Sequence, residues 1–293
     1  MKHDNLQQPQ HLTAFKQSQH RQPPRAAINR VREKFNAAKL IDICTRQDFS
    51  VYASKVTVGT DRFYWHQDNG SDILAVAHLD HVQKDASCTV TETAGGLLAC
   101  SGALDDRLGA YVILDLLPKM GMKFDILLTT DEEMGRSTAS EFYADKAYNW
   151  MIEFDRGGTD VVAYQYDTPE LAALVEESGA RMDIGSYSDI ADLDHLECVG
   201  LNWGVGYEDY HGSRSHAWLE DTFRMVARFE KFHKANGKTY LEYDYNKYFD
   251  IIDAEVMDEW IVGDCCHEVN LADATTFVED GPFINCRMCG LIP

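Results

Sequence analysis

Apolar residues along this chain form short continuous runs that alternate with segments of helical periodicity. Four mostly apolar runs have the length of buried strands: 73–77, 124–130, 150–154 and 199–205. Apolar positions three to four residues apart predict helices over 26–44, 104–117, 137–146, 171–178 and 219–234. Strands that alternate with helices are typical of a parallel sheet covered on both faces. The pattern therefore predicts an α/β fold, a three-layer αβα sandwich with a mostly parallel central sheet.

Turn residues predict how some of the strands are paired. Asn69-Gly70 lies between the aromatic run 63–65 and the apolar run 73–77, and Asn-Gly is a strong hairpin signal. We therefore expect these two runs to form a hairpin, with 73–77 as a buried central strand. Two further short strands are predicted at 88–93 and 97–100.

Composition divides the chain into three parts. Residues 1–25 hold six Gln, three Pro and three His with almost no apolar pattern, which predicts a disordered tail. Residues 26–236 contain the alternating strands and helices and form the expected catalytic domain. Residues 237–293 are predicted to be a small acidic C-terminal appendage, since 240–293 carry twelve acidic and two basic side chains. Its apolar content is low, so we expect the appendage to stay folded only if it docks against the main domain or binds a metal.

Charge and cysteine content exclude several classes of protein. The 293-residue chain has a formal net charge of −21, which argues against nucleic acid as a partner. No apolar run approaches the length of a membrane span, and the N-terminus has no secretory pattern, so no membrane association is expected. The eight cysteines are then interpreted as free thiols in a reducing compartment, which predicts a cytoplasmic location. Nothing in the sequence indicates the oligomeric state.

Polar residues that can bind metals follow the ends of the predicted strands. His78-Leu79-Asp80 follows the run at 73–77, Asp131-Glu132-Glu133 follows 124–130, and Asp155 follows 150–154. Asp105-Asp106 precedes the predicted helix at 104–117. Because ligands of open α/β sheets bind beyond the carboxyl ends of the strands, these side chains are expected to converge.

The residue types indicate a site for two metal ions. Imidazole together with carboxylate suits zinc, and several carboxylates suit a pair of metals. His78 and Asp80 lie on the same side of an extended segment, so Asp80 can orient His78. The pair Glu132-Glu133 allows one carboxylate to bind metal and the other to move protons. Five carboxylates in one crevice repel each other, and two dications would remove that repulsion.

In this order the motifs resemble those of the co-catalytic zinc peptidases, which include leucyl aminopeptidases, tetrahedral aminopeptidases and zinc carboxypeptidases. The resemblance covers about residues 70–235 and rests on His78-x-Asp80, Ala103-Leu104-Asp105-Asp106-Arg107-Leu108-Gly109, Thr130-Asp131-Glu132-Glu133-Met134-Gly135, Glu153-Phe154-Asp155 and a late His. It implies that His78, Asp105, Glu133 and Asp155 bind the metals, with Asp105 bridging both ions. It also implies that Glu132 is the general base and that Asp80 is the carboxylate beside His78.

Two histidines compete for the last ligand position. The resemblance favours His211, because the family's His commonly follows a Tyr and precedes a small residue, as in Tyr210-His211-Gly212. His216 is the alternative, and otherwise a substrate-binding residue. Asp189 resembles a family turn near the substrate pocket. Arg107 and Arg156 are expected to pair with carboxylates of the site.

The resemblance implies a hydrolase, specifically a metal-dependent exopeptidase that cleaves a peptide-like amide at the end of a short peptide. Two zinc ions, or cobalt or manganese, would hold a water molecule that loses its proton to Glu132. Aminopeptidase activity is our first interpretation; carboxypeptidase, dipeptidase and N-acyl amino-acid deacylase activities are alternatives. Two further alternatives are a non-catalytic binding protein and a single-metal aminoacyl cyclase-type enzyme. A short peptide or an N-acyl amino acid is the expected substrate.

Cysteines near the C-terminus suggest a separate structural site. Cys286-Arg287-Met288-Cys289 has the spacing of half a zinc ribbon, and nineteen residues separate Cys286 from the upstream pair Cys265-Cys266. These four cysteines would bind one structural zinc ion that holds the appendage together. The other interpretation is four reduced thiols packed against the main domain.

Overall fold

The computed structural model describes residues 22–84, 86–241 and 243, together with the backbone of three short strands near the C-terminus. These strands are β12 (Phe277–Asp280), β13 (Phe283–Cys286) and β14 (Gly290–Leu291), which pair in an antiparallel order. Of the tail expected over 1–25, residues 1–21 lie outside the described residues. The zinc site expected at Cys265, Cys266, Cys286 and Cys289 also lies outside them, because none of these side chains is described.

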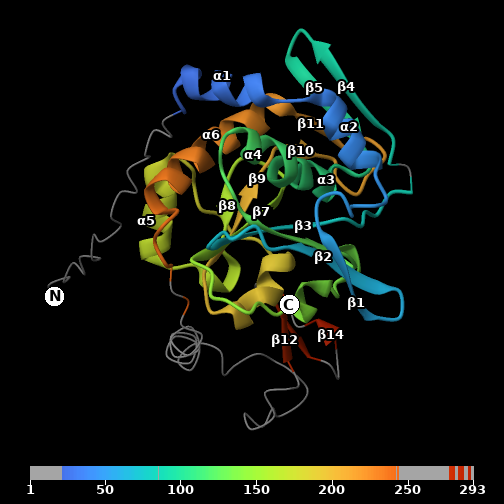
Figure 1. Cartoon of the computed structure of the whole chain (residues 1–293), viewed down its shortest axis with the longest axis vertical. Helices are drawn as coiled ribbons and strands as arrows, with labels where there is room; N and C mark the ends of the chain where they lie inside the picture. Colours follow the sequence, from blue (N-terminus) through green and yellow to red (C-terminus); the bar gives the residue numbers. More distant parts are fainter. Residues whose placement is uncertain are drawn as a thin grey trace, which may run out of the picture.

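A seven-stranded sheet forms the centre of the molecule (Figure 1), in the order β1-β2-β6-β3-β7-β9-β8. Its strands are β1 (Ser54–Gly59), β2 (Arg62–Gln67), β3 (Ile73–His78), β6 (Asp125–Thr129), β7 (Trp150–Arg156), β8 (Val161–Val162) and β9 (Gly200–Gly204). The neighbours β6, β3, β7 and β9 run parallel, and all residues of β3, β6 and β9 are buried. These four strands are the four apolar runs of the sequence, so the predicted mostly parallel sheet is confirmed.

Helices and short turns cover the two faces of this sheet and make the three expected layers (Figure 1). One face carries α3 (Leu104–Tyr111), which continues through η1 (Val112–Leu116) and α4 (Leu117–Lys119), and α6 (Leu219–Asn236). Outside them lie α1 (Arg25–Lys34), α2 (Ala37–Thr45) and α5 (Pro169–Ser178). The other face is covered by the short 3-10 segments η3 (Thr138–Glu141) and η5 (Asp189–Leu196). Further 3-10 turns are η2 (Glu132–Met134) and η4 (Tyr164–Tyr166).

Aromatic side chains fix the longest helix to the sheet. Trp150 of β7 and Trp203 of β9 are fully buried against Phe229 and Phe232 of α6. Their ring centroids lie 5.3 to 6.2 Å apart in edge-to-face arrangements. Such rings bury large apolar areas, and the edge-to-face geometry adds about 1 kcal/mol per pair. The three-residue spacing of the two phenylalanines explains why this segment is a helix with one buried side.

A second sheet of four antiparallel strands lies beside α6 and α2. It contains β4 (Cys88–Thr93), β5 (Gly96–Ser101), β10 (Tyr207–Glu208) and β11 (His216–Trp218), in the order β10-β11-β5-β4. The predicted strands at 88–93 and 97–100 are the β4–β5 hairpin. Pairing of β11 with β5 brings the loop between β10 and β11 to the edge of the central sheet.

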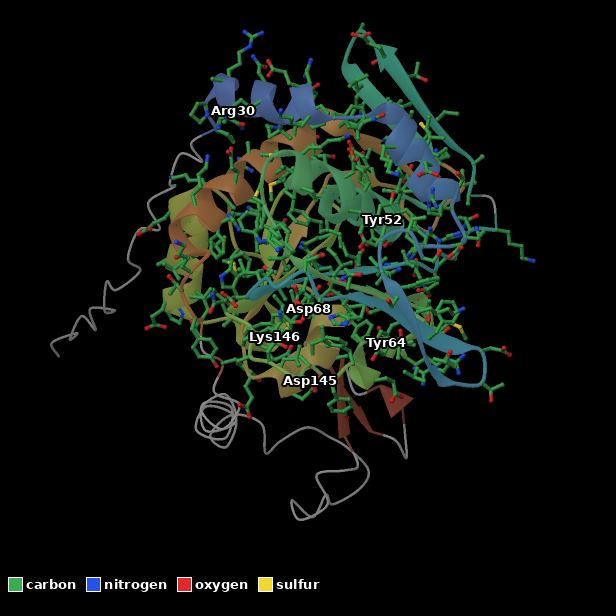
Figure 2. All side chains as sticks on the ribbon, in the orientation of Figure 1. Arg30, Tyr52, Tyr64, Asp68, Asp145 and Lys146 are labelled. Atoms are coloured by element: carbon green, nitrogen blue, oxygen red, sulfur yellow. The ribbon has the colours of Figure 1, made fainter. Side chains whose placement is uncertain are left out.

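The hairpin predicted around Asn69-Gly70 is wrong, because β6 lies between β2 and β3. The buried Asp125 carboxylate at the start of β6 accepts hydrogen bonds from the backbone N–H groups of Asn69 and Ser71 at 2.8 and 3.0 Å. Lys146 contacts the same carboxylate at 2.6 Å and Asp68 at 3.1 Å (Figure 2). The turn is therefore held around the end of a third strand, and β2 forms its hairpin with β1.

Two predicted helices also differ from the structure. The helix expected over 26–44 is interrupted between α1 and α2, where the Asn36 side chain accepts a hydrogen bond from Lys39 N and caps α2. The helix expected over 137–146 is only η3. The Ser137 hydroxyl group donates a hydrogen bond to Asp189 and accepts one from the N–H of Ala139. Such side-chain bonds to the local backbone favour a turn over a helix.

The body of the protein continues a few residues beyond the expected boundary at 236. Leu241 donates its N–H to Asn149 and accepts from the N–H of Val199, at 2.8 and 3.0 Å. Tyr243 packs edge-on against Tyr166 with ring centroids 4.5 Å apart. A deletion after residue 236 would therefore remove part of the core.

Candidate metal centre

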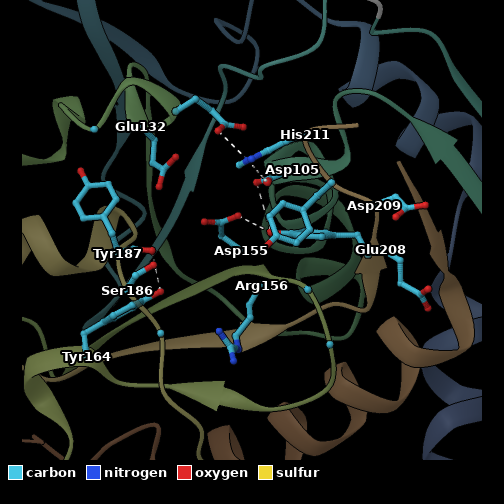
Figure 3. A pocket seen from close by; sticks show the side chains of 17 residues that line it. Asp105, Glu132, Asp155, Arg156, Tyr164, Ser186, Tyr187, Glu208, Asp209 and His211 are labelled. Atoms are coloured by element: carbon cyan, nitrogen blue, oxygen red, sulfur yellow. Dashed lines mark hydrogen bonds and ion pairs between the residues drawn. The ribbon is translucent and has the colours of Figure 1, made fainter. Parts of the chain in front are cut away.

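The carboxyl edge of the central sheet brings together the five residues predicted as metal ligands; Figure 3 shows Asp105, Asp155 and His211 among them. They are His78 at the end of β3, Asp105 at the start of α3, Glu133 in η2 after β6, Asp155 in β7, and His211 between β10 and β11. His78 is fully buried and Asp105 nearly so. Residues separated by more than 100 positions in sequence thus meet at one edge, as expected from parallel strands.

The five side chains form two groups of three that share Asp105. In the first group, His78 Nε2 lies 3.1 Å from Asp105 Oδ1 and 3.5 Å from Asp155 Oδ1. In the second, His211 Nε2 lies 3.1 Å from Asp105 Oδ2 and 2.9 Å from Glu133 Oε2. Ligand atoms of each group are within 4.8 Å of one another. Each Asp105 oxygen therefore faces one group, which is the arrangement of a bridging carboxylate.

The donor atoms of these groups fit divalent cations. Each group offers one imidazole nitrogen and two carboxylates, which are donors that zinc accepts. Glu133 Oε1 is buried without a hydrogen-bond partner, as is Oδ2 of the neighbouring Asp106. Burying an oxygen without a hydrogen-bond partner costs free energy. A cation bound by the second group would lie beside the unpartnered Glu133 oxygen. The residues present therefore suit two metal ions.

The pKa shifts of the side chains show the repulsion between carboxylates that two bound ions would relieve. Burial opposes a charge on His78, but the Asp155 carboxylate and the bond to Asp105 hold its pKa well above the usual range. Burial and repulsion from Asp105 raise the pKa of Asp155 to about 7. Burial would also raise the pKa of Asp105, but its hydrogen bonds to His211 and His78 hold it well below its usual range. Without metals, the positive charges of the protonated histidines thus balance the carboxylates. Bound dications could supply this positive charge instead.

Glu132 lies beside the two groups and belongs to neither. Its Oε2 is 3.8 Å from His78 Nε2. Burial raises the pKa of Glu132 to about 9, with repulsion from Asp155 and Glu133 adding to the effect. A carboxyl group next to the metals that is not needed as a ligand is available to hold or move a proton.

Asp80 lies beside His78, as expected, and also contacts the Glu132-Glu133 turn. The contact of His78 Nδ1 at 3.1 Å is with the main-chain carbonyl of Asp80, while its carboxylate is 3.7 Å away. The Asp80 carboxylate accepts hydrogen bonds from the backbone N–H groups of Glu132 and Glu133 at 3.3 and 3.1 Å. Asp80 therefore positions the Glu132-Glu133 turn more directly than it orients His78.

Two residues expected to bind substrate, Asp189 and His216, are not among the residues that line the cleft. Asp189 is fully buried, and its carboxylate accepts hydrogen bonds from the hydroxyl groups of Thr129 and Ser137. Its resemblance to a family turn reflects a packing role that joins η5 to β6 and η3. His216 lies in β11, with its Nδ1 at 2.9 Å from the carbonyl of Arg214, and is not among the cleft-lining residues.

The two arginines expected to pair with site carboxylates make other contacts. Arg107 is buried and donates to the carbonyls of Ile43, Arg46 and Leu79 at 2.8 to 3.0 Å. It thereby ties the end of α2 to the segment that carries His78. Arg156 pairs with Asp160, which is outside both ligand groups.

Tyr207 is a residue of the site that the sequence interpretation missed. Its hydroxyl group lies 2.6 Å from Asp155 Oδ1 and 3.4 Å from Asp105 Oδ1. Asn202 also holds Asp155, since its side chain bonds both the N–H and the C=O of that residue at 2.9 Å. Tyr207 follows Gly206 just past the fourth parallel strand, so a search for polar residues at every strand end would have found it.

Backbone conformation contributes to the shape of the site. Asp131 and His211, next to and within the site, have left-handed φ angles of 66° and 62°. Such angles are uncommon for residues other than Gly and cluster at functional sites. Gly109 of the Asp-Asp-x-x-Gly motif is required for close approach, because a Cβ there would lie 2.2 Å from Asp106 Oδ1 and 2.8 Å from the Phe154 carbonyl.

A cleft of about 760 Å³ opens onto the two ligand groups. Asp105, Glu132, Asp155 and His211 point into it (Figure 3). Tyr164, Ser186 and Tyr187 line one side of the cleft, and Glu208 and Asp209 line the other (Figure 3); Gly185 and Tyr210 also line it. The volume lies in the range of small-molecule and peptide sites.

The metal-free protein should lose stability as the pH rises from about 6 to 9. Folding raises the pKa of Asp155 to about 7 and of Glu132 to about 9. The folded state then binds more protons than the unfolded state, so deprotonation favours unfolding. We expect the melting temperature of chelator-treated protein to fall by roughly 5 °C or more across this interval.

Bound dications should abolish this fall, because they replace the protons that balance the carboxylates. Thermal unfolding at pH 6, 7.5 and 9, with and without zinc, measures both effects. A melting temperature of the metal-free protein that is constant or rises with pH would contradict the charge distribution described.

Comparisons with known proteins were made for the sequence and for the fold. No protein-family model and no curated protein matches the sequence. Among solved structures, a tripeptidase from Staphylococcus aureus matches with 11% identity and a TM-score of 0.48, over 69% of this chain and 91% of the other. The TET1 peptidase of Pyrococcus horikoshii matches with 13% identity and a TM-score of 0.39, over 69% and 93%. An aminopeptidase from the archaeon Desulfurococcus kamchatkensis matches with 12% identity and a TM-score of 0.40, over 78% and 97%.

At these identities and TM-scores the likeness does not establish an activity. The chemistry therefore has to be inferred from the site itself. Among the described helices, none is both long enough and apolar enough to span a membrane.

Proposed function

We propose that this protein is a two-metal exopeptidase that removes the N-terminal residue of a short peptide. The observation that carries the proposal is the pair of ligand groups that share Asp105, with Glu132 next to His78 of the first group and part of neither. His78, Asp105, Asp155, Glu133 and His211 would hold the two ions. When bound, zinc ions activate water and polarise a carbonyl group.

The remaining steps fall to side chains of the chain itself. Glu132 takes a proton from the attacking water and passes it to the amine that leaves. Burial first, and then repulsion from Asp155, raise the pKa of Glu132 to about 9 without metals, so Glu132 would need the nearby dications to lose its proton before it can act as the base. Asp80 holds the Glu132 and Glu133 backbone, so the base and its neighbouring ligand keep a fixed spacing. Tyr207 and Asn202 keep Asp155 in place from the opposite side.

Charges in the cleft favour a free amino group over a free carboxylate. Among the described residues that line it, Arg156 is the only Arg or Lys, and Asp160 and the Ile184 carbonyl already occupy its guanidinium. Glu208 and Asp209 add two carboxylates beyond the ligand groups. A peptide's α-ammonium group is attracted to such a wall, whereas a C-terminal carboxylate finds no unpaired Arg or Lys there. This supports an aminopeptidase over a carboxypeptidase.

The environment of the cysteines supports a cytoplasmic location as part of the same proposal. The described cysteines Cys44, Cys88, Cys100 and Cys198 are all free thiols. Free thiols persist in reducing compartments.

A matched substrate panel tests the proposal. Full-length protein loaded with zinc, cobalt or manganese is given aminoacyl amides with a free amino group, their N-acetylated counterparts, and dipeptides. We expect at least tenfold higher kcat/KM for the free amines than for the N-acetyl compounds. Preference for the N-acetyl compounds would indicate a deacylase, and cleavage of dipeptides alone would indicate a dipeptidase; either result overturns the assignment.

Metal content separates the proposal from functions of other classes. Elemental analysis should give two ions per chain for a variant in which Cys286→Ser and Cys289→Ser remove the C-terminal thiol pair. One ion would favour a single-metal cyclase-type enzyme, and none would favour a non-catalytic binding protein. The same measurement on the unchanged chain shows whether these cysteines bind a third ion.

A further inference from the structure

The loop between β10 and β11, which carries His211, has a strained backbone. Asp209 and His211 have left-handed φ angles of 51° and 62°. Such angles are unfavourable for residues that have a Cβ, and they persist where the surrounding structure holds them. The His211 side chain is 48% exposed, whereas that of His78 is fully buried. Core packing therefore fixes His78, but the position of His211 depends on contacts that hold its loop.

Gln83 makes such a contact from a distant part of the chain. Its side-chain Nε2 donates a hydrogen bond to the main-chain carbonyl of His211 at 2.6 Å, across 128 positions of sequence. Gln83 is partly exposed and does not line the cleft. Because the accepting carbonyl belongs to the ligand residue itself, the bond holds the backbone from which the imidazole projects toward Asp105 (Figure 3).

Gln83 belongs to the short segment after β3, which also holds the other end of the second ligand group. Asp80 of this segment accepts a hydrogen bond from the backbone N–H of Glu133 at 3.1 Å. Three residues later, Gln83 donates to the backbone of His211. Glu133 and His211 are the two ligands that the second group has in addition to the shared Asp105. One segment thus holds the main chains of both ligands.

The segment after β3 is itself fixed to the body of the protein. The buried Arg107 guanidinium donates to the carbonyl of the buried Leu79 at 2.8 Å. The His81 ring contacts the main-chain carbonyl of Gln83 through Nδ1. A side chain that projects from a fixed backbone positions its partner more precisely than one from an unsupported loop.

We propose that Gln83 is a positioning residue for the second metal ion and acts through the main chain of His211. This inference rests on the two-metal site proposed above. The bond from Gln83 holds the imidazole where Asp105 and Glu133 already lie, so less conformational freedom is lost when an ion binds. Residues that orient a ligand without binding the metal typically change metal affinity by 10–100-fold.

The test replaces Gln83 by Met, whose unbranched side chain has a similar length but no N–H group. Zinc is titrated into chelator-treated full-length protein in which Cys286→Ser and Cys289→Ser remove the C-terminal thiol pair. We expect one of the two binding steps to weaken at least tenfold and the other to stay within about threefold of the unchanged chain. The weakened step should be the one that His211→Ala also weakens.

Gln165 provides the matched control. Its Nε2 donates to the main-chain carbonyl of Ala191 at 2.9 Å, so Gln165→Met removes the same kind of bond elsewhere in the body of the protein. Both zinc affinities of this variant should stay within about threefold of the unchanged chain. Equal weakening of both steps in Gln83→Met, or the same weakening in Gln165→Met, would show a general effect on stability and overturn the proposal.

Hydrogen exchange tests the contact without metal. In chelator-treated protein, the backbone amides of residues 209–214 should exchange roughly fivefold faster in Gln83→Met, because one hydrogen bond fewer holds the loop closed. Gln165→Met should exchange there as the unchanged chain does.

The outcomes separate this inference from the proposed function. If the unchanged chain binds two ions, and Gln83→Met binds both as tightly or leaves the exchange of the loop unaltered, only the role of Gln83 is overturned. If the unchanged chain binds fewer than two ions, the two-metal function fails, and the inference fails with it.

Discussion

Replacing Glu132 by Gln should lower kcat by about 10²–10⁴-fold while the protein keeps its fold and both metal ions. The amide has nearly the same shape as the carboxyl group but cannot take a proton from water. Glu132 belongs to neither ligand group, so metal binding should not depend on its charge. Turnover of the best substrate in the panel, together with elemental analysis of the same sample, measures both parts of the prediction.

The adjacent residue provides the control for this experiment. Glu133 Oε2 lies 2.9 Å from His211 Nε2 and belongs to the second ligand group. Glu133→Gln should therefore lose the ion of that group as well as activity. If Glu132→Gln keeps the turnover of the unchanged enzyme, or if it loses metal as Glu133→Gln does, the division of roles between the two residues is wrong.

His211→Ala should weaken metal binding in the second group by about 100-fold or more and abolish activity. Loss of residues that only support a ligand typically costs 10–100-fold in metal affinity, so loss of a ligand should cost at least as much. His211 supplies the only imidazole of the group formed with Asp105 and Glu133. Titration of the chelator-treated protein with zinc measures the affinity, and a substrate assay measures the activity.

His216→Ala is the matched variant, five residues further along the chain. Its ring contacts the carbonyl of Arg214 at 2.9 Å and lies 3.8 Å from Glu208 Oε2, but it is not in either ligand group. We expect two metal ions and activity within about threefold of the unchanged enzyme. If His211→Ala keeps both ions and His216→Ala loses one, then His216 is the ligand and our assignment to His211 is wrong.

The candidate ligands could be predicted because their information is local. Each predicted strand ends in residues of a recognisable type, such as His78-x-Asp80 after an apolar run, and parallel strands place their carboxyl ends at one edge. The choice between His211 and His216 could not be made this way, since both follow the same strand. Pairing of β11 with β5 holds His216 in the strand, whereas His211 stays in the loop that reaches Asp105, which favours His211.

The supporting residues were harder to predict because their partners are distant in sequence. Arg107 sits in a motif full of carboxylates, and yet it donates to the main chain of α2 and of the His78 segment. A buried guanidinium has five donors to satisfy, and carbonyls at a helix end meet them as well as a carboxylate does. Nothing near Arg107 in the sequence indicates that α2 would supply them.

The sequence by itself determined the class of the fold and the chemistry at its edge. The periodicity of strands and helices depends on residues close together in the sequence, and so does the position of the charged residues that follow the strands. Local patterns of this kind agree with the final fold. Only the tertiary structure decided which strands are neighbours, because hydrogen bonds between strands are the same for any pair of apolar runs. The insertion of β6 between β2 and β3 depends on the buried carboxylate of Asp125, which binds a turn more than 50 residues away. The same long-range packing brings Tyr207 to Asp155, a contact that no spacing along the chain specifies.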